Sequence, residues 1–401
     1  MSQHDYVIAD QSHTAFRADL NLALAASVGL NSGATAPATT YAYMLWADTT
    51  TALLKIRDST NASWLVVGPI APTVALQRAF LSVDMPKLVV TGAAGILTIA
   101  LKNASGADAS AVEPITLPFR NSTLATGDST LLQVTAALSQ TLSSGSTLGV
   151  TTGPAKVWFV LFNDGGTARI GAVNCLSGTT VMALRNDDLQ SSTAEGGAGA
   201  ADSAQTIYTG TAVTSKAMCI LGYAEWTSLT AGTWTTPDKV QQYRPGVALP
   251  GDVVQVQRNA TGAVATGTTV IPNDDTIPQN TEGDQYMSQA ITPRSAANVL
   301  AVRAQAILGN VTSSTDLMVA ALFQDSTASA LAVAYGPKSG GNGPANLTLG
   351  HSLRAGTTSA TTFKVRGGQA TAGTTTFNGH NAARLYGGVL NSFIEVQEIV
   401  A

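Results

Sequence analysis

Apolar residues recur every four positions near the start of the chain and predict one short helix. Phe16, Leu20 and Leu24 fall on one helical stripe, and the alanines among them favour the same structure. Asp10-Gln11-Ser12 offers a capping segment, and Asn31-Ser32-Gly33 provides a stop. So short a helix has little of its own chain to cover the stripe. The pattern predicts burial against a partner chain or another copy; the alternative is an ordinary helix packed on a small domain.

The next apolar runs are separated by polar turns and predict a three-stranded β-meander. Two runs, Tyr41–Ala47 and Ala52–Arg57, flank a turn of Asp and Thr, and a third covers Ser63–Val67. We expect Trp46 and Trp64 to pack across this sheet. Two prolines then mark a boundary near residue 75.

The rest of the chain reads as short strands separated by turns rich in Gly, Asp and Asn. The predicted strands before residue 250 are Leu88–Val90, Ile96–Leu101, Leu131–Val134, Lys156–Phe162, Ala168–Leu176 and Lys216–Trp226. Those after it are Asn298–Leu308, Leu317–Phe323, Leu331–Tyr335, Thr361–Val365 and Phe393–Val400. A run of Pro and Gly between residues 245 and 251 marks a second boundary.

These elements predict a mainly β fold. It begins with the short helix and small meander and continues with two β-sandwich or jelly-roll-like domains. The boundaries give three domains, 1–75, 76–248 and 249–401.

Composition points to structural material rather than to catalysis. Only 11% of the residues are charged, against about 25% in an ordinary globular protein. Ala, Thr, Ser and 38 Gly take their place, and 45% hydrophobic content suffices for real cores. Enzymes rely on perturbed acids, bases or nucleophiles, and the chain offers few, so we expect no enzyme activity.

Charge and hydropathy also limit the partners. The net charge is −4, and Lys and Arg form no basic stripe, which argues against nucleic-acid binding. The first residues lack the basic and apolar segments of a secretory signal, and no apolar run approaches the length of a spanning helix. We therefore expect synthesis and use in a cytoplasm.

A few carboxylates are candidates for acid–base chemistry or for Ca²⁺ binding. They are adjacent or nearly so: Asp187, Asp188, Asp274, Asp275, Glu282 and Asp284. A glycosidase needs two carboxyls across a bond, whereas adjacent strand residues point to opposite faces. A calcium site near Asp274–Asp284 stays open. Solvated turns are the expectation, with no catalytic residue, no metal and no cofactor.

The remaining candidates are histidines, cysteines and aromatic residues. His4, His13, His351 and His380 lack zinc-like spacing. Cys175 and Cys219 lie in apolar runs and are expected as buried thiols, with a disulfide as the alternative. Five aromatic residues are expected to be partly buried in the core, with stacking on sugars as the alternative; they are Trp226, Trp234, Tyr243, Tyr335 and Tyr386.

Three stretches carry a resemblance that spans nearly the whole chain. They include YVIADQSHTAFRADLNLAL near the start, VWFVLFNDGGTARIGAVNCLSG in the centre and NDDTIPQNTEGD before the last strands. Together they resemble the tail-fibre and other virion-fibre structural proteins of tailed bacteriophages. The resemblance implies a homotrimer in the virion, assembled in the host cytoplasm.

The family also implies roles for the three domains. Residues 1–75 would attach to other virion proteins of tail or head, with Phe16, Leu20, Trp46 and Trp64 buried against a neighbour. Residues 76–248 would be a spacer. Residues 249–401 would face the receptor, a host cell-surface glycan or protein, through residues not yet identified. Alternatives are a head fibre or capsid decoration protein, a tailspike-type polysaccharide depolymerase and a tail-fibre adaptor.

Overall fold

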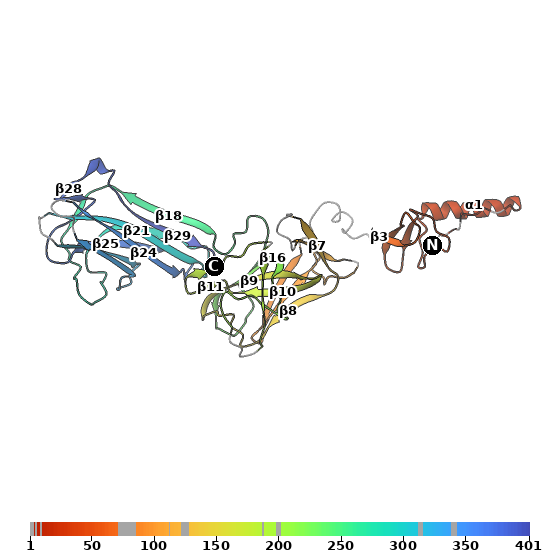
Figure 1. Ribbon diagram of the computed structural model, residues 1–401, viewed down its shortest axis with the longest axis horizontal. Helices are drawn as coiled ribbons and strands as arrows, with labels where there is room; N and C mark the ends of the chain where they lie inside the picture. Colours follow the sequence, from red (N-terminus) through yellow and green to blue (C-terminus); the bar gives the residue numbers. More distant parts are fainter. Residues whose placement is uncertain are drawn as a thin grey trace. The chain divides into compact units, whose positions relative to one another are not determined.

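The computed structural model describes residues 4, 6–8, 10–70, 86–111, 113–121, 128–186, 188–197, 202–311, 316–337 and 343–401 (Figure 1). The chain forms two compact units. Unit 1 comprises Met1–Val89, Ile99–Ser139 and Asn163–Ala168, and unit 2 comprises Val90–Thr98, Gln140–Phe162 and Arg169–Ala401. The predicted mainly β fold with a short N-terminal helix is confirmed.

The N-terminal elements of unit 1 are the helix and meander that the sequence predicts. They are α1 (His13–Val28), β1 (Leu45–Asp48), β2 (Leu53–Arg57) and β3 (Trp64–Pro69). The strands pair antiparallel in the order β1-β2-β3. Ser12 occupies the N-cap, but its side chain makes no capping hydrogen bond. After Gly29 the chain turns sharply, with Leu30 and Asn31 both at a φ of 51°.

Two small sheets follow in the sequence. One has the order β4-β5-β8, and the other pairs β6 with β7. Their bounds are β4 (Lys87–Ala93), β5 (Ile96–Lys102), β6 (Ile115–Arg120), β7 (Ser129–Val134) and β8 (Leu138–Leu142).

The central sheet has the order β13-β16-β9-β10-β15-β14, with β17 also paired to β16. Its strands are β9 (Gly153–Asp164), β10 (Thr167–Val173), β13 (Leu189–Gln190), β14 (Thr193–Ala194), β15 (Tyr208–Thr209), β16 (Lys216–Leu229) and β17 (Lys239–Gln242). A short hairpin of β11 (Leu176–Ser177) and β12 (Thr180–Val181) lies between β10 and β13 in sequence. Strand β9 is buried from residue 155 to residue 162, so both of its faces are covered. This burial explains why its sequence is apolar without alternation from Val157 to Phe162.

The C-terminal part of unit 2 is a β-sandwich. Its larger sheet has the order β18-β29-β21-β26-β19, with β24 also paired to β21, and its smaller sheet has the order β20-β25-β22-β23. The larger sheet contains β18 (Val253–Thr261), β19 (Ala265–Gly267), β21 (Val299–Asn310), β24 (Ala345–Arg354), β26 (Thr375–Phe377) and β29 (Ser392–Ile399). The smaller sheet contains β20 (Asp284–Ile291), β22 (Leu317–Gln324), β23 (Ala332–Pro337) and β25 (Thr361–Gln369).

The two sheets of the sandwich share one apolar core. Leu300 and Ile394 from the larger sheet and Leu322 and Phe363 from the smaller sheet are all fully buried in it. Every second residue is buried in β29 and in β25 as far as residue 367, which is the period of a strand with one face on a core. The chain then adds a short hairpin of β27 (Gly379–His380) and β28 (Ala383–Arg384) and the turn η1 (Tyr386–Gly388).

One of the two predicted boundaries falls between described elements. The Pro/Gly segment 245–251 lies after β17 and before β18, where the central sheet ends and the sandwich begins. The boundary near residue 75 falls in 71–85, outside the described residues. The division into three domains stays a prediction. Among the described residues, no helix has the length and apolarity needed to cross a bilayer.

Candidate docking interface of the N-terminal module

Helix α1 buries small side chains and exposes large ones. Its buried residues are Ala23 and Ala26. Four of its exposed apolar residues recur every four positions: Phe16, Leu20, Leu24 and Val28, at 43%, 38%, 55% and 86% exposure. Leu22, which lies off this stripe, is 58% exposed as well. At about 1.5 Å per residue this stripe runs roughly 18 Å along the helix. The predicted stripe therefore exists, and within one copy it is the alanine face that is covered instead.

Strand β3 exposes apolar side chains as well. Leu65, Val66 and Val67 are 53%, 60% and 53% exposed. Successive strand residues point to opposite faces, so both faces of β3 present apolar groups to solvent. In the order β1-β2-β3 this strand is also an edge. Long apolar edges pair with other chains unless something covers them, so β3 is a second candidate for docking.

Trp46 and Trp64 pack against each other in the meander. The Trp46 and Trp64 ring centroids are 5.2 Å apart, which confirms that they pack across the sheet. The Trp46 indole Nε1 donates to the Gly33 carbonyl at 3.2 Å, and Trp46 is only 6% exposed. Lys55 lies over the Trp46 ring at 4.8 Å. Trp46 therefore has little surface left for a neighbour, whereas Trp64 is half-buried.

Asp48 organises the turn between β1 and β2. Its side chain, 5% exposed, accepts hydrogen bonds from Lys55 Nζ at 2.8 Å and from Thr51 Oγ1 at 2.7 Å. The backbone amides of Thr50 and Thr51 donate to it at 2.9 and 3.2 Å. The Lys55 ammonium holds the pKa of Asp48 well below its ordinary range, and the Thr51 and Thr50 bonds act in the same direction against the opposing effect of burial.

We expect Asp48→Asn to loosen the meander at pH 7, because an amide does not bind Lys55 and the turn amides as a carboxylate does. Protection factors for amides of residues 45–57 should fall about tenfold or more. A carboxylate with a lowered folded pKa stabilises the fold above the unfolded pKa of about 3.9, and this stabilisation is lost as the pH falls through the folded pKa. The difference between variant and parent should therefore shrink toward acid. Hydrogen exchange at pH 7 and pH 3 measures it, and equal protection at pH 7 would contradict the assignment.

The carboxylates near residue 280 each accept hydrogen bonds of their own: Asp274 and Glu282 lie in turns, and Asp284 is the first residue of β20. Asp274 accepts from the Thr276 amide at 2.8 Å and the Thr276 hydroxyl at 2.5 Å, and these bonds lower its pKa. Glu282 accepts the amide of residue 279 at 2.9 Å, and Asp284 the amide of residue 269 at 3.0 Å. In the described part of the chain no three His, Cys, Asp or Glu side chains gather as metal ligands would. Asp187 lies outside the described residues.

The other sequence candidates divide between core and surface. Trp226 and Trp234 are each 1% exposed, with ring centroids 5.5 Å apart, so core burial is confirmed for this pair. Tyr335 and Tyr386 are 68% and 76% exposed, and the expectation of core burial is wrong for both. Tyr243 is half-buried.

The two cysteines are thiols rather than partners in a disulfide. Cys175 is buried, and burial raises the pKa of its thiol. Cys219 is half-buried, so the prediction of a buried thiol is right for Cys175 only.

Sequence reasoning missed a buried polar cluster in unit 2. Lys156 Nζ donates to Asn298 Oδ1 at 2.7 Å, and Asn298 Nδ2 donates to Glu398 Oε1 at 2.7 Å. Glu225 Oε1 lies 3.7 Å from Lys156 Nζ. The sequence signal for the cluster is a charged residue at a buried place in each of two strands, Lys156 in β9 and Glu398 in β29.

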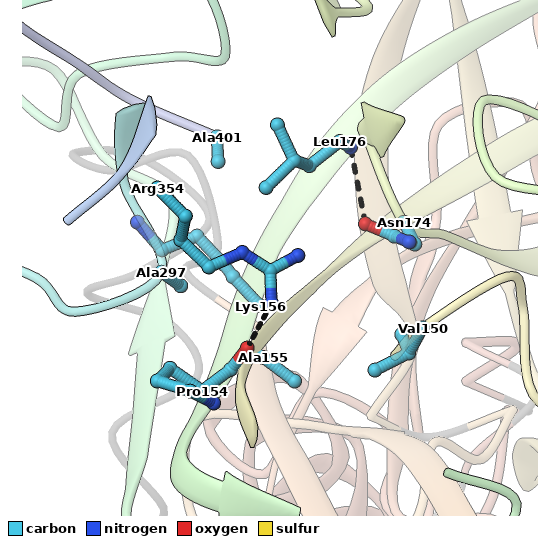
Figure 2. A pocket seen from close by; sticks show the side chains of 9 residues that line it. All are labelled: Val150, Pro154, Ala155, Lys156, Asn174, Leu176, Ala297, Arg354 and Ala401. Carbon is cyan, nitrogen blue, oxygen red and sulfur yellow. Dashed lines mark hydrogen bonds between the residues drawn. The ribbon is translucent and has the colours of Figure 1, made fainter. Parts of the chain in front are cut away.

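A small cavity lies beside this cluster. Its volume is about 10 Å³, which is room for about one water molecule. Figure 2 shows Lys156, Arg354 and Ala401 among the residues that line it, with the Arg354 guanidinium donating to the Pro154 carbonyl. A cavity of this size does not admit a sugar or a nucleotide.

Comparisons with known proteins leave the family open. No family model and no curated protein matches the chain. Among solved structures it is similar to the VP2 subviral particle of infectious bursal disease virus, at 12% identity over 79% of this chain and 75% of that chain, with a TM-score of 0.20. The structure of the Gx strain of that virus is similar at 12% identity over 79% of this chain and 77% of that chain, with a TM-score of 0.21. Dimeric latent PorU from Porphyromonas gingivalis is similar at 10% identity over 65% of this chain and 25% of that chain, with a TM-score of 0.20. Similarities this weak carry no conclusion about function.

Proposed function

We propose that this chain is a homotrimeric fibre protein of a bacteriophage tail, anchored to the virion by residues 1–75 and presenting residues 249–401 to the host surface. The observation that carries the proposal is the exposed stripe of Phe16, Leu20 and Leu24 on α1. The resemblance of three stretches of sequence to tail-fibre and other virion-fibre proteins supports the same conclusion.

The proposed occupant of the α1 stripe is the same stripe of two further copies. Four-residue spacing keeps its side chains on neighbouring turns of the helix, where they can interlock with those of a second helix. A closed cyclic trimer buries one patch of every copy in an equivalent environment. A helix of sixteen residues is marginal by itself, so mutual burial of the stripe would also stabilise α1.

The proposed occupant of β3 is a strand of the virion protein to which the fibre attaches. An edge strand offers unpaired backbone groups to such a partner, and pairing of this kind draws its affinity from main-chain hydrogen bonds. The exposed Leu65, Val66 and Val67 would then be covered on both faces of the strand. Many copies on one particle would multiply weak contacts of the distal sandwich with the host surface.

The oligomeric state tests the α1 contact. We expect the full chain to be a trimer by light scattering, and Leu20→Asn with Leu24→Asn to dissociate it. Loss of two buried leucines per copy should weaken association at least about a hundredfold. Arg17→Asn, on the same helix but off the stripe, is the matched control and should stay trimeric. A parent chain that remains monomeric at high concentration would overturn the proposal.

The position on the virion is tested on intact particles. We expect a label attached near residue 10 to appear at the tail in electron micrographs. A label on the head would instead identify a head fibre or decoration protein, and absence of the chain from mature particles would contradict both. Release of reducing sugar from host glycan, abolished by Asp274→Asn, would instead identify a depolymerase.

A further inference from the structure

Three polar side chains from distant parts of the sequence meet inside unit 2. Lys156 in β9 is 6% exposed, Asn298 immediately before β21 is 2% exposed, and Glu398 in β29 is 0% exposed. They form a chain of hydrogen bonds, with Lys156 Nζ at 2.7 Å from Asn298 Oδ1 and Asn298 Nδ2 at 2.7 Å from Glu398 Oε1. An amine, an amide and a carboxylate thus lie in line in a site that excludes bulk water.

We propose that Lys156 and Asn298 join covalently, by an isopeptide bond between Nζ and Cγ that forms within the folded chain with release of ammonia.

The amine is placed and prepared for attack. Because a C=O bond is about 1.23 Å long, a nitrogen 2.7 Å from Oδ1 is at most about 3.9 Å from Cγ, close to the separation of a near-attack geometry. Burial lowers the pKa of Lys156 to about 8, although nearby Glu225 acts in the opposite direction. An appreciable fraction of Nζ is therefore the neutral, nucleophilic amine near neutral pH.

The amide is polarised at its oxygen. Besides Lys156, the amide N–H of Ala401 donates to Asn298 Oδ1, at 3.3 Å. This N–H can hold the negative charge that develops on Oδ1 when Nζ adds to Cγ. Donors fixed in a buried site need no reorganisation during the reaction, which is where such stabilisation is largest.

One carboxylate lies near each nitrogen that must lose or gain protons: Glu225 near Lys156 Nζ, and Glu398 near Asn298 Nδ2. Glu225 Oε1 lies 3.7 Å from Lys156 Nζ and also accepts the hydroxyl of Ser295. Glu398 accepts from Asn298 Nδ2 and is fixed by the backbone amides of Arg294 at 2.9 Å and Ser295 at 3.2 Å. Glu225 is therefore placed to take protons from the attacking nitrogen. Glu398, itself an ionised acceptor, is placed to relay to the leaving nitrogen protons that it has first received.

The reaction balances without any other reagent. Starting from the Lys156 ammonium, two protons leave Nζ, the Nζ–Cγ bond forms, and the bond from Cγ to Nδ2 of Asn298 breaks. Nδ2 gains two protons through Glu398 and departs as ammonium. The two protons that Glu225 takes from Nζ replace them by exchange through a water molecule, for which the adjoining cavity has room, so both carboxylates end ionised as they began. Oxidation states do not change. The cavity beside Lys156, with its volume of about 10 Å³, is large enough for one molecule the size of ammonia.

Mass spectrometry of the folded full-length protein tests the bond. We expect the intact mass to be lower than the sequence mass by one ammonia. Protease digestion should yield one linked pair of peptides, one with Lys156 and the other with Asn298, and trypsin should no longer cleave after Lys156. Lys156→Met should abolish the linked pair, because Met fills the space of the lysine stem but has no amine.

Matched variants separate the reaction from the fold. Lys239→Met is the control for Lys156, because Lys239 lies 3.9 Å from Glu225 but is half exposed and makes no contact with Asn298 that the structure records; it should keep the linked pair. Glu398→Gln should slow linkage at least about a hundredfold by removing the carboxylate that relays protons to Nδ2. The full sequence mass with normal cleavage after Lys156, in parent protein incubated in its folded state, would overturn the proposal. Ammonia loss that maps to an Asn-Gly pair would overturn it as well.

Discussion

Replacing Glu398 by Ala should lower the free energy of unfolding of unit 2 by about 3–5 kcal/mol. The carboxylate is fully buried and accepts hydrogen bonds from the amides of Arg294 and Ser295 and from the side chain of Asn298. The substitution leaves these donors without an acceptor in a site that water does not reach. It also removes one of the negative charges that act on buried Lys156.

Denaturant unfolding followed by tryptophan fluorescence measures this loss, since Trp158 lies in the same unit and its indole donates to the Ala401 oxygen at 2.8 Å. Glu395→Ala is the matched control. It lies on the same strand, its side chain is 17% exposed, and Arg258 is 3.8 Å away. An ion pair of this kind contributes about 0–1 kcal/mol. Equal losses in the two variants would show that Glu398 has no special role in the interior.

Phe363→Ala should destabilise the sandwich by about 3–5 kcal/mol. The ring is 0% exposed, lies in β25 and belongs to the core that the larger and smaller sheets share. Truncation removes its burial and leaves a cavity that two hydrogen-bonded sheets cannot collapse to fill. The effect should appear as a lower midpoint in calorimetry or denaturant unfolding.

Tyr335→Ala is the control for Phe363. Tyr335 lies on β23 of the same smaller sheet and is 68% exposed, so its loss should change the free energy of unfolding by no more than about 0.5 kcal/mol. The same variant measures whether this exposed ring takes part in sugar binding. A Phe363 variant as stable as the Tyr335 variant would mean that the sheets are not packed as described.

Local patterns were enough to predict most elements of the fold. The spacing of Phe16, Leu20 and Leu24 predicted α1, and the alternation from Asn298 to Leu308 predicted β21, because helix and strand periods are properties of neighbouring residues. The apolar runs Lys156–Phe162 and Ala168–Leu176 predicted two successive strands, and β9 and β10 form there. The β-sandwich followed from the number and spacing of such runs.

The parts that the sequence did not predict depend on distant residues. Lys156 and Asn298 are separated by 142 positions, and no periodicity relates them. A charged residue beside an apolar run is also compatible with a strand end in solvent. The sequence also did not predict which face of α1 is buried. Ala23 and Leu24 are both apolar, and only tertiary packing determines which of them is covered.

The position of β29 in the larger sheet has a consequence for how the protein folds. β29 lies between β18 and β21 and pairs with both, although 130 residues separate Thr261 from Ser392, which face each other. Of the strands of this sheet, β29 is therefore synthesised last. Until then, the edges of β18 and β21 that pair with it are unpaired. Contacts of such high order make folding slow, so the sandwich should be completed only once β29 has been synthesised, in a single late step that is prone to aggregation at high expression rates.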